Sequence, residues 1–351
     1  MISNRENFLR TVKFRNPQWI PSQVHINGAE WAAFKKDIED VVLRHPTLFP
    51  SYFKGRIKFN EMNYDLDHVN MNEIVDQWGC TWIYPITGLD GVNIRHPLEN
   101  LDDFESYVPP VPKFNVNTVE EWKTEIDYVQ RLKEKGELAA ASTDHGILFM
   151  RLTYLRGFEN ALIDFATEEP KLQPMIDMIT DYYMKIVEFH IRRRVDLLTF
   201  AEDLGTQEST IISPKDFKKW IAPAYKKLMD PCRANGILIG LHSDGKTLDI
   251  LEDQIAAGVD IVNPQDLCNG IDNLARRIKG KACIELDIDR QSVVPFGTRK
   301  DIDDLIKEET MKLGSKNGGL TFVVGIYPPT PPENLDAVCC ALEKYRTWWW
   351  D

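Results

Sequence analysis

The chain has 351 residues, enough for two domains of ordinary size or for one large α/β barrel with an extension. Acidic residues outnumber basic residues by 54 to 42, and the net charge of −12 speaks against a nucleic-acid partner because a phosphate backbone would be repelled. The apolar stretches are too short to cross a bilayer and no apolar signal region follows Met1, so we expect a cytoplasmic protein without a membrane partner. Six cysteines without CxxC spacing indicate neither a disulfide framework nor a thiolate zinc knuckle.

The first part of the chain, residues 1–114, is the least regular. Ile20–Ile26 has the pattern of a strand, and we interpret the rest as an elaboration that covers one mouth of a barrel. Next, Ala139–Arg151 begins like a strand, and Lys171–Arg194 has the apolar periodicity of a helix. These residues begin an alternation of strands and helices that continues along the chain.

The middle of the chain contains a strand followed by an interrupted helix. Val195–Leu204 is rich in apolar residues and predicts a strand. For the helix that follows, Ser213 is the expected N-cap and Pro214 the first helical residue. Pro223 lies inside the helical pattern, where its missing N–H should kink the helix or split it in two.

Three glycines spaced by 22 residues, Gly236, Gly258 and Gly280, mark repeated units in the second half of the chain. Each follows a helical pattern and suits the left-handed residue just beyond a helix end. Each also precedes an apolar run that is typical of a strand buried on both faces. Leu320–Ile326 and Glu333–Tyr345 add a late strand and a last helix.

About eight such units would close a (β/α)8 barrel, which is the fold that we expect. We assign the chain to one domain, in which 115–351 form the main barrel and 1–114 the first strand and the elaboration over the carboxyl-end mouth. No GxGxxG or GxxxxGK[ST] motif follows the predicted strands, so the sequence gives no motif support for a nucleotide-binding sheet.

Polar residues gather where these strands should end, which in a parallel barrel is where the chemistry takes place. His242 and Asp244 are two residues apart, so their side chains leave the strand on the same side. With Glu202, and with Glu285 or Asp287 from a later strand, they make a ligand set for a divalent metal such as zinc. An unmetalled polar site and a purely structural role for His242 are alternatives.

The same rim supplies candidates for catalysis and for substrate binding. We expect catalytic roles for His242, Asp244, Glu202 and Tyr327. The substrate-binding candidates are the polar and aromatic residues near the predicted mouth: Asp203, Gln207, Asn263, Gln265, Tyr154 and Phe200. His145 could also face the mouth, although a loop histidine without such a role is an equal alternative.

The ordered set of these motifs resembles the uroporphyrinogen decarboxylase superfamily, whose members are (β/α)8 barrels. The resemblance covers nearly the whole chain. It is carried by short motifs in the family's order: Arg5, Leu9 and Ile20-Pro21, then Glu202–Gln207, Ser213-Pro214, Leu241–Gly245 (LHSDG), Asp260–Asp266 (DIVNPQD), Pro295–Thr298 (PFGT) and Pro331–Asn334 (PPEN). The family's decarboxylase uses an arginine-rich N-terminal segment, which residues 15–40 lack, and this difference speaks against that activity.

The corrinoid-dependent methyltransferase branch is a better match. Many of its members resemble this chain at Asp76–Trp82 and His96–Leu98. Its thiol-methylating members hold zinc with an H-x-C pair and a later cysteine, whereas this chain has His242-x-Asp244 and a cysteine-free 316–319 segment. Oxygen and imidazole ligands suit a harder oxygen substrate, of which a methyl ether is an example.

The resemblance therefore implies a methyltransferase that removes a methyl group from a small methoxylated aromatic compound. The acceptor would be the reduced corrinoid of a separate corrinoid protein, because this chain lacks the D-x-H-x-x-G corrinoid-binding pattern. A decarboxylase of a smaller substrate and a non-catalytic binding barrel are the alternatives. The tryptophans of 348–350 would pack on the barrel or on a second copy in a homo-oligomer.

Overall fold

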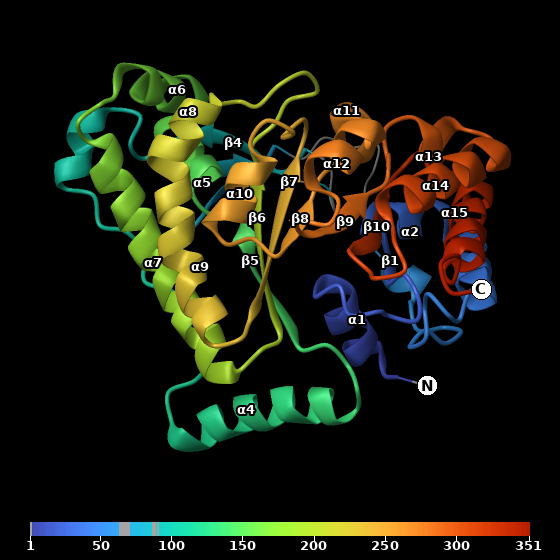
Figure 1. Ribbon diagram of the computed structural model, residues 1–351. Coiled ribbons are helices and arrows are strands. Elements are labelled where there is room, and N and C mark those ends of the chain that lie inside the picture. The colour runs from blue at the N-terminus through green and yellow to red at the C-terminus, as the bar shows by residue number, and fades with distance from the viewer. Residues whose placement is uncertain (1, 63–70, 86–88, 90) are drawn as a thin grey trace.

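Figure 1 shows the computed structural model of the chain, which describes residues 2–62, 71–85, 89 and 91–351. Seven parallel strands form one curled sheet in the order β1-β10-β9-β8-β7-β6-β5. These strands are β1 (Ser22–Ile26), β5 (Ala140–His145), β6 (Leu197–Asp203), β7 (Leu238–Asp244), β8 (Ile261–Asn263), β9 (Cys283–Asp287) and β10 (Leu320–Ile326). The first and last of them, β1 and β10, are neighbours, as a barrel requires. The predicted α/β barrel is confirmed.

The seven-stranded sheet differs from the prediction in its number of strands. It holds seven strands among the described residues, whereas the repeating units predicted about eight. The chain between β1 and β5 instead contains a separate antiparallel sheet of three short strands: β2 (Glu73–Val75), β3 (Thr81–Ile83) and β4 (Val92–Arg95). The N-terminal elaboration is therefore built around a small sheet of its own.

Most of the helices follow the strands and cover the outside of the curled sheet (Figure 1). Their bounds are α1 (Asn4–Val12), α2 (Gly28–Phe34), α3 (Lys36–Arg44), α4 (Val119–Glu134), α5 (Phe149–Arg156), α6 (Phe158–Thr167), α7 (Leu172–Arg193), α8 (Pro214–Asp216), α9 (Ala222–Ala234), α10 (Leu251–Ala257), α11 (Asp266–Asn269), α12 (Ile271–Ile278), α13 (Val293–Phe296), α14 (Arg299–Leu313) and α15 (Pro332–Tyr345). In the described part of the chain no helix combines the length and the apolar character that a membrane span needs.

The local sequence signals explain where several helices begin and end. The Ser213 hydroxyl accepts the Asp216 N–H at 3.1 Å, which confirms it as the N-cap of α8. A π-helical turn then separates α8 from α9, and Pro223 lies at the start of α9, so the predicted split occurs. Gly236, Gly258 and Gly280 all have positive φ, as expected beyond helix ends.

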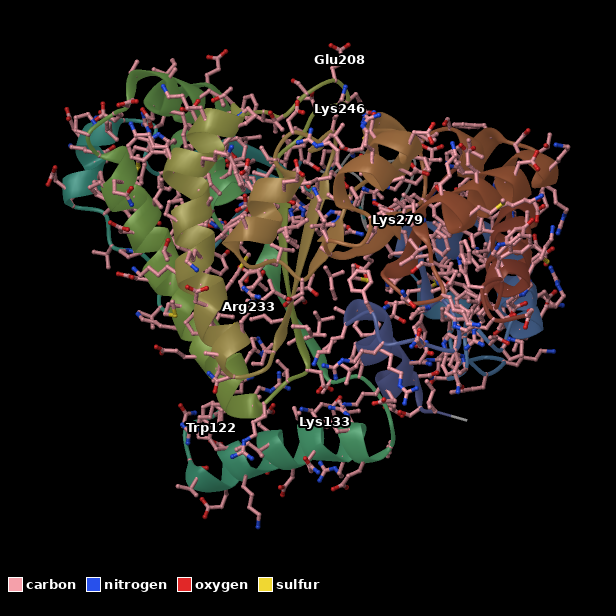
Figure 2. The ribbon with its side chains drawn as sticks, in the orientation of Figure 1. Trp122, Lys133, Glu208, Arg233, Lys246 and Lys279 are labelled. Carbon is pink, nitrogen blue, oxygen red and sulfur yellow. The ribbon has the colours of Figure 1, made fainter. Side chains whose placement is uncertain are left out.

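The carboxyl ends of the strands share one end of the barrel. Glu208 and Lys246, which follow β6 and β7, lie at the upper end in Figure 2. Lys133 lies at the opposite end on α4, which precedes β5 (Figure 2). The upper end is therefore the mouth at which polar strand-end residues meet.

A buried ion pair connects α5 and α6, the helices that follow β5, to the N-terminal elaboration. Arg156 Nε and Nη2 donate to the two carboxylate oxygens of Asp164 at 2.7 and 3.2 Å, and both side chains are almost fully buried. Arg156 Nη1 also donates to the carbonyl oxygens of Leu98 and Glu99. The guanidinium thus ties α5 and α6 to the chain that follows β4.

We predict that Arg156→Ala lowers the free energy of unfolding by about 3–5 kcal/mol, because it leaves the Asp164 carboxylate buried without a partner. Urea unfolding followed by circular dichroism measures the loss. Lys300→Ala is the control, since its pair with Asp304 is exposed to solvent and its loss should leave the midpoint of unfolding unchanged. A loss below about 1 kcal/mol in Arg156→Ala would show that this pair does not hold the segment in place.

Candidate active site

Side chains alternate between the two faces of each strand, and the register decides which of them meet. β6 and β7 are paired so that Ala201 lies beside His242 and Asp203 beside Asp244. β7 and β8 are paired so that His242 lies beside Asn263. These side chains share the face that lines the inside of the barrel, and three of them, Asp203, His242 and Asp244, line one cavity at the mouth.

Glu202 and Phe200 belong to the opposite face of β6 and point toward the surrounding helices. Phe200 is fully buried in the hydrophobic core. The Glu202 carboxyl is also fully buried, and its Oε1 accepts the N–H groups of Leu148 and Phe149 at the start of α5. Burial raises the pKa of Glu202 to about 8. Neither residue lines the cavity, and the structure ties Glu202 to the position of α5.

His242 has a defined orientation. Its Nδ1 is hydrogen bonded to the side-chain oxygen of Asn263, whose Nδ2 donates to the carbonyl oxygen of Glu285 at 2.7 Å. Because that second bond fixes the amide, Asn263 presents an acceptor to His242, and Nδ1 carries the proton. Nε2 therefore keeps its lone pair on the cavity side, 3.4 Å from Asp244 Oδ1.

Asp244 already has two donors. Its Oδ1 accepts Arg290 Nη2 at 2.5 Å and Gln265 Nε2 at 3.0 Å. Arg290 Nη1 is also 3.6 Å from Asp287 Oδ2, and burial raises the pKa of Asp287. The guanidinium lies 5.6 Å from the ring centroid of Tyr327, so this cation is held from three sides.

His145 joins the site through an irregularity in β5. The pairing of β5 with β6 shifts between Ser142 and His145, and the shift places His145 beside Ala201, on the inner face. Its Nε2 is 3.5 Å from Asp203 Oδ1, and its ring centroid is 6.0 Å from that of His242. The hydrogen-bonding Asp203 carboxylate raises the pKa of His145. The structure thus places His145 at the mouth, a position that the sequence left open.

These residues form the polar wall of a cavity of about 1110 Å³. Its aromatic wall consists of Trp82 and Tyr84 of the N-terminal elaboration, Tyr154 on α5 and Tyr327 just after β10. The two walls and their rim are lined by Asp76, Trp82, Tyr84, Leu89, Gly91, Val92, Asn93, His145, Met150, Arg151, Tyr154, Asp203, His242, Asp244, Arg290, Gln291 and Tyr327. Tyr154, Asp203 and Tyr327, which the sequence predicted to lie near the mouth, therefore line the same cavity.

Two charged residues fix the aromatic wall. Asp76 Oδ2 accepts the indole N–H of Trp82 at 3.0 Å, and Trp82 meets Tyr154 edge to face with centroids 4.7 Å apart. The buried Arg151 guanidinium lies 5.3 Å from the Tyr154 ring centroid and 3.7 Å from Asp76 Oδ2. Because Asp76 and Asp144 both lie near it, Arg151 balances charges of this wall rather than offering a free cation to a ligand.

The remaining predicted residues lie around the site. The Asn263 side chain is hydrogen bonded to Nδ1 of His242, and Gln265 Nε2 donates to Asp244. Gln207 and Gln265 line a smaller neighbouring cavity of about 470 Å³. Burial raises the pKa of Glu285, which lies near His242 on the inner face, to about 7. Sequence reasoning did not single out Asp76 and Arg151 for the site. Asp76 entered only as part of the motif Asp76–Trp82, and Arg151 only as the last residue of the stretch Ala139–Arg151, where the structure has a helix.

Two groups of described side chains at the mouth could hold a metal ion, and His242 belongs to both. One group is His145, Asp203 and His242, and the other is His242, Asp244 and Asp287. Neither group includes Glu202 or Glu285, which the sequence placed in the ligand set. The residues of the second group were all named for the predicted metal site, whereas His145 and Asp203 of the first group were not.

Comparisons with known proteins agree with the fold. Residues 75–345 match the sequence profile of uroporphyrinogen decarboxylase (URO-D). The structure resembles a methyltransferase from Methanosarcina mazei, with a TM-score of 0.65 and 15% identity over 98% of this chain and 99% of that chain. A B12-independent methionine synthase from Shewanella sp. W3-18-1 gives a TM-score of 0.43 and 10% identity over 68% and 67% of the two chains. A search of curated proteins finds no match.

The placement of Glu202 leads to a stability prediction. Glu202→Gln should keep the free energy of unfolding within about 1 kcal/mol at pH 7, because a neutral amide oxygen can still accept both N–H groups. Glu202→Leu should cost about 2–4 kcal/mol, because two buried N–H groups lose their acceptor. Denaturant unfolding of both variants provides the comparison. Equal stability of the two variants would contradict the assigned contact with α5.

Proposed function

Because the chain belongs to the uroporphyrinogen decarboxylase family, we propose that it is a methyltransferase of the corrinoid-dependent kind. Its methyl donor is a small methoxylated aromatic compound, and its acceptor is the reduced corrinoid of a separate corrinoid protein. The observation that carries this proposal is the composition of one cavity, whose lining combines aromatic side chains with two imidazoles and with carboxylates.

The aromatic wall suits a flat ring. Trp82 and Tyr154 are fixed edge to face, and Tyr84 and Tyr327 extend the apolar lining. A ring that binds here gains from burial and from defined aromatic contacts. A volume of about 1110 Å³ exceeds what a single-ring compound fills, so an open side remains for a second reactant.

The polar wall suits the oxygen atom that leaves with the ring. When the methyl carbon is transferred, the carbon–oxygen bond breaks and its electron pair stays on oxygen as a phenolate, whose conjugate acid has a pKa of about 10. A cation or a proton donor at that oxygen stabilises the leaving group. His145 and His242 lie on the inner face where such a group is needed.

The acceptor and the metal are the parts of the proposal that come from outside this chain. The reduced corrinoid supplies the nucleophile that takes the methyl group. A zinc ion would act as a Lewis acid at the ether oxygen. The donor set fits such an ion, because Asn263 holds Nδ1 of His242 and leaves Nε2 on the cavity side.

A methyl-transfer assay tests the proposal. The purified protein is incubated with reduced corrinoid and a panel of methoxylated aromatics, while loss of the reduced corrinoid absorbance and formation of the phenol are followed. We expect transfer with at least one compound, and we expect His242→Ala to lower its rate by about 10²–10⁴-fold. Lys300→Ala, on α14, should keep the full rate.

Two outcomes would overturn the proposal. Carbon dioxide release without any corrinoid would identify a decarboxylase of the same family. Full activity of His242→Ala would show that the reaction takes place elsewhere in the protein.

A further inference from the structure

We infer that one divalent cation of the zinc class binds to His145, Asp203 and His242, with one ligand from each of the neighbouring strands β5, β6 and β7. The pair His242 and Asp244, which the sequence pattern suggests, is not the core of this site. The use of the cation as a Lewis acid rests on the proposed function, whereas the site itself rests on the geometry of the mouth.

The first argument is the lone pair on His242. Asn263 fixes the proton on Nδ1, so Nε2 is an acceptor that faces the cavity. The nearest oxygen of Asp244 is 3.4 Å away and is an acceptor as well. Because Asn263 occupies Nδ1, Nε2 is the ring nitrogen through which His242 can bind a cation in the cavity.

The second argument is that Asp244 is already neutralised. Its Oδ1 accepts both Arg290 and Gln265, and the same guanidinium is 3.6 Å from Asp287. Arginine does not lose its proton in proteins, so a metal bound by Asp244 and Asp287 would have to displace a fixed cation. The group of His242, Asp244 and Asp287 is therefore a poor metal site.

The third argument is the geometry of His145 and Asp203. Their ligand atoms are 3.5 Å apart. Two ligands on a tetrahedral zinc ion, each bonded at about 2.0–2.2 Å, lie about 3.3–3.5 Å from each other. The ligand atoms of all three residues lie within 4.8 Å of one another. Small movements of the side chains would therefore complete the coordination.

The surroundings of Asp203 support the assignment. The backbone N–H of Asp244 donates to Asp203 Oδ1 at 3.2 Å and holds the carboxylate on the inner face. Among the described residues the ion pair of Asp203 is with His145, and no arginine or lysine competes for it. Two imidazoles and one carboxylate leave a fourth position open, and all three residues line the cavity, so that position faces a bound substrate.

Nitrogen ligands also select the kind of ion. Imidazole suits zinc and related transition metals, whereas magnesium and calcium prefer sites made of oxygen atoms. A site with two histidines should therefore bind Zn²⁺ or Co²⁺ and not Mg²⁺.

Metal binding by the purified full-length protein tests this inference without any corrinoid or substrate. After chelation and dialysis, the protein is titrated with Zn²⁺ and, separately, with Co²⁺, whose visible absorption reports tetrahedral nitrogen and oxygen ligands. We expect one ion per chain in the wild type. His145→Ala, Asp203→Ala and His242→Ala should each weaken binding by more than about 100-fold, and Asn263→Ala by about 10–100-fold.

Asp244→Asn is the matched control, because it keeps the backbone N–H that holds Asp203 and changes only the carboxylate next to Arg290. We expect it to bind Zn²⁺ within about threefold of the wild type. Because the side chain of His145 is 47% exposed, His145→Ala should keep the fold, and His145→Gln is a second variant for the same position. Circular dichroism checks the fold of each variant.

The inference is overturned if the wild type binds no ion. It is also overturned if Asp244→Asn loses the ion while His145→Ala keeps it, since this result would assign the ion to the other group. If the ion binds as described and no methoxylated compound reacts, the site stands and the proposed function fails. If the metal-free protein transfers methyl groups at the full rate, the ion is not the Lewis acid of that reaction.

Discussion

The hydrogen bond between His242 Nδ1 and the Asn263 side chain is the interaction on which the chemistry of the mouth depends. It sets the tautomer of the imidazole and leaves Nε2 as the atom that faces the cavity. Asn263 can play this part because the β7–β8 register places it beside His242, and because the Glu285 carbonyl oxygen orients its amide. Backbone pairing deep in the sheet thus determines which atom of His242 is available at the surface of the cavity.

The charged groups of the cavity fall into two sets: those that stabilise its walls and those that could bind a cation. Arg290 on one side balances Asp244 and Asp287, and Arg151 on the other side lies near Asp76 and Asp144. Arg290 and Arg151 therefore each stabilise part of the cavity lining through these contacts. Among the described residues, His145, Asp203 and His242 have no ion pair with an arginine or lysine, and this is the place to which we assign the metal ion.

Much of the fold is readable in the sequence, because glycine spacing, helix caps and apolar runs are local signals. The strand at 197–203, the cap at Ser213 and the interruption before Pro223 illustrate this. The adjacent acids Glu202 and Asp203 illustrate the limit, since only one of them can face the barrel interior. A parallel strand buried on both faces has no alternation of polar and apolar residues that would tell which one. His145 depends on a register shift in β5, and the Arg290 contacts depend on the loop after β9, so neither position follows from residue type and spacing.

The tautomer of His242 is the most direct test of this account. In protein labelled with ¹⁵N in its histidines, two-dimensional correlation of the ring nitrogens with the ring protons distinguishes Nδ1–H from Nε2–H. His242→Ala identifies the signals. The account predicts that neutral His242 carries its proton on Nδ1, and that the Nε2 signal, not the Nδ1 signal, shifts when Zn²⁺ is added. A neutral ring with the proton on Nε2 would contradict it, because the lone pair would then point at Asn263 and not into the cavity.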